Sequence, residues 1–297
     1  MRTTFLASIV ASVLSFSSVV TSETIFEDSF ESGSLTSANG VDFKWSNTKT
    51  SSVVSDVAQV YITEPVNMAI PAFSNWDTVD GKHSMRLFYP AGQSWTEQRF
   101  HIGQGYEEIW IRYWIRVPTN YEHTNIRPNN NKFFALWMDD YSGKGAGATV
   151  FWNTYRDQAD GGSRLSFTYN EGNHGTSKSQ SHLVKFIKVP EDRGRWMQVV
   201  YHVRASSTTD SSDGYVGFWR RWEGEQEFTR LQEVTDIKLI IPSGGPNGWG
   251  KGYLMGWANA AYAEDTEWLI DDLVVATHSL VSTSKSNSPN APILYVE

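Results

Sequence analysis

The sequence contains no cysteine, so it can form no disulfide bond, no thiolate nucleophile and no zinc site with thiolate ligands. It also lacks an excess of basic residues, because 25 lysines and arginines stand against 33 aspartates and glutamates, a formal net charge of −8. Binding to nucleic acid needs clustered Lys and Arg, so no nucleic-acid partner is expected. Beyond the N-terminal segment no apolar run approaches the ~20 residues of a membrane-spanning helix, so no membrane partner is expected for the mature chain.

Aromatic residues, in contrast, are abundant. The 297 residues include 13 Trp, 13 Tyr and 15 Phe, and 40% of the chain is hydrophobic. That content can bury a sizeable core, which excludes wholesale disorder. A single all-β sandwich can occupy this length.

The N-terminus has the pattern of a secretory signal peptide. Met1 and Arg2 give a positive start, the stretch from Leu6 to Val20 is apolar, and Val20-Thr21-Ser22 offers small or tolerated residues for cleavage. We therefore expect residues 1–22 to be removed and the mature protein, a monomer, to be secreted or periplasmic. Residues 23–280 are interpreted as one domain, and residues 281–297 as a loose C-terminal tail.

Strand patterns dominate the rest of the chain. From Glu108 to Val117 apolar residues alternate with Trp and Arg, which predicts that Ile109, Ile111, Tyr113, Ile115 and Val117 face the core. Further strands are predicted at Met85–Tyr89, Trp95–Ile102, Lys132–Met138, Thr149–Tyr155, Leu165–Asn170, Trp196–Arg204, Tyr215–Trp222, Tyr253–Asn259 and Trp268–Ala276. Many strands and no long helical period indicate an all-β fold, a two-sheet antiparallel jelly-roll sandwich.

The order of several local motifs resembles that of jelly-roll polysaccharide lyases with a concanavalin A-like fold. The motifs are Phe26–Gly33, Ser94–Phe100, Glu108–Pro118 followed by Asn131–Trp137, Gly194–Arg204, Asp213–Trp219, Gly244–Trp249 and Trp268–Val275. The set is similar to the alginate and glucuronan lyases of polysaccharide lyase families 14 and 20. The chain departs from them at Val150 and Trp152, where family 14 has Ser and Arg, and it keeps only Tyr169 of a Tyr-x-Tyr pair.

The resemblance implies β-elimination on a uronate polymer, which needs a cation for the sugar carboxylate and a base for the C5 proton. Arg99 is the candidate for the carboxylate, and Glu97, on the same face of its strand, would orient it. Lys132 would add positive potential. Tyr169, or His174 in the loop that follows, would move the proton. No cofactor is implied for catalysis.

Four tryptophans are candidate platforms for sugar rings: Trp137, Trp152, Trp249 and Trp257. An indole face packs against the apolar face of a pyranose, and its N–H reaches a hydroxyl. For each of the four taken singly, a place in the core is the favoured alternative.

Acids near both ends of the domain suggest a structural Ca²⁺, since similar jelly rolls hold one between their first and last strands. The acids are Glu27, Asp28, Glu31, Asp271 and Asp272. Solvated strand-end acids are the alternative.

The sequence therefore predicts a secreted polysaccharide lyase that binds an acidic polysaccharide in a concave groove. A noncatalytic carbohydrate-binding or surface protein on the same fold remains the alternative, because a fold alone does not separate the two.

Overall fold

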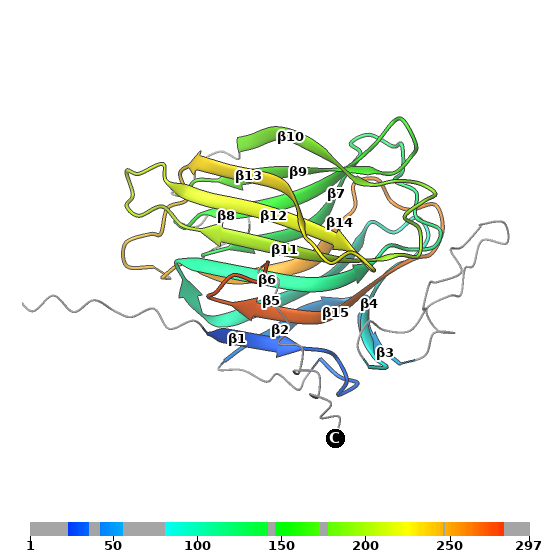
Figure 1. Cartoon of the computed structure of the whole chain (residues 1–297), viewed down its shortest axis with the longest axis horizontal. Helices are drawn as coiled ribbons and strands as arrows, with labels where there is room; N and C mark the ends of the chain where they lie inside the picture. Colours follow the sequence, from blue (N-terminus) through cyan, green and yellow to red (C-terminus); the bar gives the residue numbers. More distant parts are fainter. Residues whose placement is uncertain are drawn as a thin grey trace, which may run out of the picture.

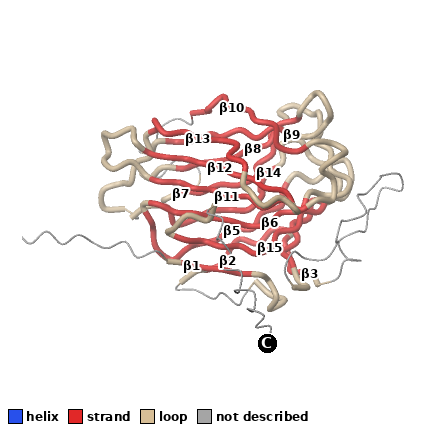
Figure 2. Tube along the Cα trace, in the orientation of Figure 1, coloured by secondary structure: helices blue, strands red, loops and turns tan. Residues whose placement is uncertain are grey.

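The computed structural model describes residues 23–35, 42–55, 81–139, 141, 146–172, 178–245 and 247–281. All regular secondary structure within these residues is β-strand, as Figure 2 shows. No helix long and apolar enough to cross a membrane occurs in this part of the chain. The expected signal peptide and nearly all of the expected tail lie outside the described residues.

The first layer of the sandwich is an eight-stranded antiparallel sheet with the order β13-β12-β11-β6-β15-β4-β3, in which β1 also pairs with β15. Its strands are β1 (Thr24–Asp28), β3 (Ser51–Val54), β4 (Ser84–Tyr89), β6 (Glu108–Arg116), β11 (Trp196–Arg204), β12 (Gly214–Trp222), β13 (Thr229–Ile237) and β15 (Thr266–Ala276).

The second layer is a seven-stranded antiparallel sheet with the order β10-β9-β8-β7-β14-β5-β2. Its strands are β2 (Lys44–Lys49), β5 (Trp95–Tyr106), β7 (Asn130–Trp137), β8 (Thr149–Arg156), β9 (Ser163–Asn170), β10 (Lys178–Ile187) and β14 (Trp249–Trp257). Figure 1 shows the two sheets as stacked layers. The predicted all-β, two-sheet jelly-roll sandwich is confirmed.

The core lies between the sheets and is rich in aromatic rings. Ile109, Ile111, Tyr113, Ile115 and Val117 are all fully buried in it, as their spacing predicts. From the facing sheet, Phe134 stacks on Tyr201 of β11 with ring centroids 3.9 Å apart. Many tryptophans and tyrosines are therefore used to fill the space between the layers.

Strands that the sequence patterns did not reveal include β10 and β13, which close one edge of each sheet. Both are rich in polar and charged residues, which is how edge strands avoid pairing with other chains. Their pairing with β9 and β12 is specified by those neighbours and not by apolar alternation of their own.

Candidate functional site

The outer face of the seven-stranded sheet carries a cluster of charged and aromatic side chains. On β5, Phe100 and Ile102 point into the core, so Glu97, Arg99 and His101 point outward. A separate aromatic cluster lies on the same side of the sheet, formed by Ala135, Trp137 and Tyr253 with Tyr141 and Phe151 packed against them. We call Glu97, Arg99, Lys132, Tyr141 and Tyr253 the tyrosine site.

Arg99 is held in place by a buried acid. Its Nε lies 2.5 Å from Oε1 of Glu97, whose side chain is only 5% exposed. The Arg99 guanidinium also lies over two aromatic rings, 5.2 Å from the centroid of Tyr141 and 5.8 Å from that of Trp137. Because the acid lies underneath, the guanidinium is fixed and still reaches the surface.

Two tyrosine hydroxyls meet beside this arginine. The ammonium of Lys132 donates a hydrogen bond to Tyr141 Oη and lies 4.8 Å from the centroid of the Tyr141 ring. The Tyr253 hydroxyl lies 3.4 Å from that of Tyr141. Burial, reinforced by the neighbouring Tyr141, holds the pKa of Tyr253 well above its ordinary value, although Arg99 acts in the opposite direction. Tyr253 is therefore a neutral phenol at neutral pH.

Gly256 keeps the floor of the tyrosine site open. Its φ of +140° is a conformation that residues with a side chain rarely adopt. A Cβ added there would lie 3.1 Å from Lys132 Cβ and 3.2 Å from Tyr253 Cε2. The glycine is thus required both by the backbone and by the space between these side chains.

A cleft of about 730 Å³ extends the site along β5 and β14. Lys44, His101, Gln104, Asp139 and Lys251 are among the residues that line it. Burial lowers the pKa of His101, and the cations Lys251, Lys44 and Arg99 lower it further. The imidazole is therefore neutral at neutral pH. The lining of the cleft carries two lysines, Lys44 and Lys251, and two acids, Asp42 and Asp139.

At the other end of β5 two tryptophans are exposed to solvent. Trp95 is 40% exposed and Trp257 is 44% exposed, and their ring centroids are 6.2 Å apart. Trp257 thus lies where a sugar platform is expected. Trp137, in contrast, is buried beneath Arg99 and supports that side chain.

Three of the predicted site residues lie in the core instead, and these predictions are wrong. Tyr169 is 6% exposed and stacks on Phe167, because both share the inward face of β9. Trp152 is fully buried on the inward face of β8, where its Nε1 donates to Gln232 Oε1. Trp249 is also fully buried in the core. None of them can touch a polymer on the outer face. His174 lies outside the described residues.

The acids expected to bind calcium do not gather into one site. The first and last strands are neighbours, since Asp28 pairs with Leu273. However, Asp28 accepts hydrogen bonds from the Phe30 amide and the Trp45 indole, and Glu31 accepts from the amides of Lys82 and His83. Within the described ranges no three His, Cys, Asp or Glu residues form a group that could hold a metal ion.

The remaining acids of that set do not complete a cluster among the described residues. Asp271 is fully buried and accepts from the Asp272 amide, and Glu27 pairs across the sheet with Val274. The predicted five-acid cluster is therefore wrong. A structural Ca²⁺ as such stays a prediction, which melting curves in calcium and in EDTA test.

In comparisons with known proteins, matches were found among solved structures. No family model matches the sequence, and no curated protein matches it. A mutant of alginate lyase Aly36B in complex with alginate trisaccharide is 13% identical, with a TM-score of 0.47, over 66% of this chain and 82% of that chain. Alginate lyase vAL-1 from Chlorella virus is 8% identical, with a TM-score of 0.45, over 68% and 87% of the two chains. The cellulose-induced protein Cip1 is 13% identical, with a TM-score of 0.42, over 85% and 97%.

Proposed function

We propose that the protein is a polysaccharide lyase that cleaves a uronate-containing polymer by β-elimination at the tyrosine site. The observation that carries the proposal is the convergence of Arg99, Lys132 and Tyr141 on one surface. An arginine that is held from behind can bind a sugar carboxylate, and a phenol oxygen beside an ammonium can carry negative charge.

The groups of the tyrosine site support both proton transfers of a β-elimination. Arg99 pairs with the uronate carboxylate and stabilises the charge that develops when C5 loses its proton. The C5 proton passes to Tyr141 Oη while the hydroxyl proton of Tyr141 passes to the departing glycosidic oxygen. The electron pair of the C5–H bond forms the C4=C5 double bond, the C4–O bond breaks, and Tyr141 ends as the phenol it was.

Two further residues position Tyr141 and do not touch the polymer. Lys132 donates to the Tyr141 oxygen, and the buried, neutral Tyr253 lies within reach of the same oxygen. The exposed Trp95 and Trp257 would support sugar rings on one side of the site. On the other side, Lys44 and Lys251 of the cleft would contact further carboxylates of the polymer, with Asp42 and Asp139 beside them.

The test is to incubate the mature chain with alginate, glucuronan and glycosaminoglycans and to follow the ultraviolet absorbance of the C4=C5 bond. The proposal expects unsaturated products from at least one polymer. Arg99→Ala should weaken binding and slow turnover together, because the carboxylate contact exists in the ground state and strengthens in the transition state. If a uronate polymer binds and none yields an unsaturated product, the noncatalytic carbohydrate-binding function replaces the lyase.

A further inference from the structure

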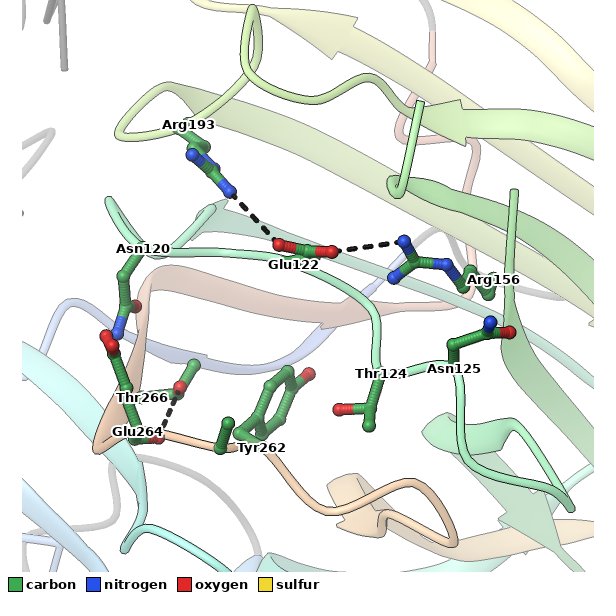
Figure 3. A pocket seen from close by; sticks show the side chains of 10 residues that line it. Asn120, Glu122, Thr124, Asn125, Arg156, Arg193, Tyr262, Glu264 and Thr266 are labelled. Carbon is green, nitrogen blue, oxygen red and sulfur yellow. Dashed lines mark hydrogen bonds and ion pairs between the residues drawn. The ribbon is translucent and has the colours of Figure 1, made fainter. Parts of the chain in front are cut away.

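A second cavity, of about 440 Å³, lies at one end of the sandwich. Its walls come from the loops that join β6 to β7, β10 to β11 and β14 to β15, together with the end of β8. Figure 3 shows Glu122, Arg156 and Arg193 on one side of it and Tyr262 on the other. None of its lining residues belongs to the tyrosine site.

The two arginines of this cavity are fixed by the backbone of the loop that follows β6. Arg156 donates to the carbonyl of His123, and Arg193 Nε donates to the carbonyl of Tyr121 at 2.6 Å. Their side chains are only 17% and 16% exposed. Both guanidinium groups are therefore held in the cavity wall before any ligand arrives.

A carboxylate of the chain itself lies between them. Glu122 Oε1 is 3.0 Å from Arg156, and Glu122 Oε2 is 4.0 Å from Arg193. Unlike the arginines, the Glu122 side chain is 57% exposed. An ion pair with a solvent-exposed carboxylate adds little to the free energy of unfolding. The Glu122 side chain can therefore move away from the arginines at a small cost in stability. The arginines would keep their hydrogen bonds to the backbone carbonyls of His123 and Tyr121.

The rest of the lining is polar and includes a second acid, Glu264, which acts electrostatically on Arg193. Figure 3 shows Asn120 on one side, Thr124 and Asn125 on the other, and the ring of Tyr262 between them. Amides and hydroxyls are groups that recognise sugar hydroxyls, whereas Tyr262 is only 4% exposed and belongs to the core beneath them. The volume also lies in the range of small-molecule sites, roughly 300–1,000 Å³.

We propose that this cavity is a second saccharide-binding site, which takes a sugar that carries a carboxylate. The sugar carboxylate replaces Glu122 between Arg156 and Arg193, as a bidentate partner of guanidinium groups that are already in position. We expect this cavity to bind a saccharide without cleaving it, because Tyr141 and Tyr253 of the tyrosine site do not line it. The proposal does not depend on lyase activity at the tyrosine site.

The experiment is an NMR titration of the full mature chain with sodium D-glucuronate, with D-glucose and acetate as separate controls. All variants carry Arg99→Ala, which removes the carboxylate contact of the tyrosine site. Glu122→Gln removes the competing charge and should raise the affinity for glucuronate about two- to fivefold, the range that an exposed ion pair allows. Adding Arg193→Gln should then lower that affinity at least about tenfold, because the ligand carboxylate loses a fixed charged partner.

Arg164→Gln is the matched control, since Arg164 pairs with Asp157 at 3.2 Å and does not line the cavity. It should leave glucuronate binding unchanged, and melting curves of all variants check that they fold. Three results would each overturn the proposal: equal affinity of the Glu122→Gln and parent proteins, equal binding of glucose, or equal binding of acetate. The last would show a site for any small anion and not for a saccharide.

Discussion

The two arginine sites of the protein differ in the position of their carboxylate partner. Glu97 lies beneath Arg99 with its side chain 5% exposed, whereas Glu122 lies in front of Arg156 with its side chain 57% exposed. In the proposed function the first carboxylate orients an arginine toward the polymer, whereas the second carboxylate lies on the solvent side of its arginines. The first also has two tyrosine hydroxyls, 3.4 Å apart, beside its arginine. The positions of Glu97 and Glu122 thus distinguish the proposed catalytic site from the proposed binding site.

The largest effect in this comparison is expected from Glu97→Gln. The substitution keeps the shape of the Glu97 side chain but removes its negative charge, which pairs with Arg99. The Arg99 guanidinium should therefore no longer be held in one orientation. The responsive polymer is the one that yields unsaturated products in the assay above. We expect kcat/KM on it to fall roughly 10–100-fold, because a small misplacement of a group that positions the substrate slows the reaction strongly. Steady-state kinetics of product formation measures it.

The matched control for that variant is Glu267→Gln. Glu267 also lies beside an arginine, with Oε1 3.7 Å from Arg86, but on the other sheet. We expect its kinetics to stay within about twofold of the parent protein, because Glu267 lies on the other sheet, away from the tyrosine site. An equal loss in both variants would mean that the kinetic loss comes from destabilisation and not from the position of Glu97.

A smaller effect is expected from Gly256→Ala. The added methyl would crowd Lys132 and Tyr253, so kcat/KM should fall about tenfold. Gly224→Ala is the control, because Gly224 has a φ of +83° and nothing within 4 Å of an added Cβ. Both variants should lose about 1–3 kcal/mol of unfolding free energy from backbone strain. If Gly224→Ala loses as much activity, crowding of the tyrosine site is not the cause.

The smallest effect concerns the pH dependence of stability. Burial raises the pKa of Glu267 to about 7, although Arg86 opposes the shift. The folded state then binds the proton more tightly than the unfolded state, so stability should fall as the pH rises from about 4.5 to 7. Because solvent partly screens the group, we expect about 1 kcal/mol from this residue.

Urea unfolding at pH 5 and pH 8 measures that loss. In Glu267→Gln the contribution should vanish, so the difference in unfolding free energy between the two pH values should shrink. An unchanged difference would show that Glu267 is ionised throughout this range.

Much of the fold was predictable because alternation marks the strands that fill the core. The run from Glu108 to Val117 fixes its buried face by itself. The same rule applied to β9 groups Leu165, Phe167 and Tyr169 on one face, and this signal places Tyr169 inside. The resemblance to a Tyr-x-Tyr pair suggested the opposite and was wrong, because a motif match does not show which face of a strand lies outward.

The tyrosine site itself was only half predictable. Glu97 and Arg99 share a strand face by their spacing alone, and the structure pairs them. Tyr141 follows the end of β7 in a stretch without periodicity, so no local pattern places its ring over Arg99. Its position results from the register of β7, β14 and β5 across the sheet, which a single sequence does not reveal.

The most direct test of the account compares two single tyrosine substitutions, Tyr141→Phe and Tyr169→Phe. Each deletes one hydroxyl and keeps the ring, and the rate of unsaturated product formation on the responsive polymer is the measurement. We expect Tyr141→Phe to lose ~10²–10⁴-fold in turnover, with polymer binding largely retained, because it removes the proton-transferring group. Tyr169→Phe should keep its activity, because its ring lies in the core. Full activity in Tyr141→Phe, or loss of activity in Tyr169→Phe alone, would contradict the account.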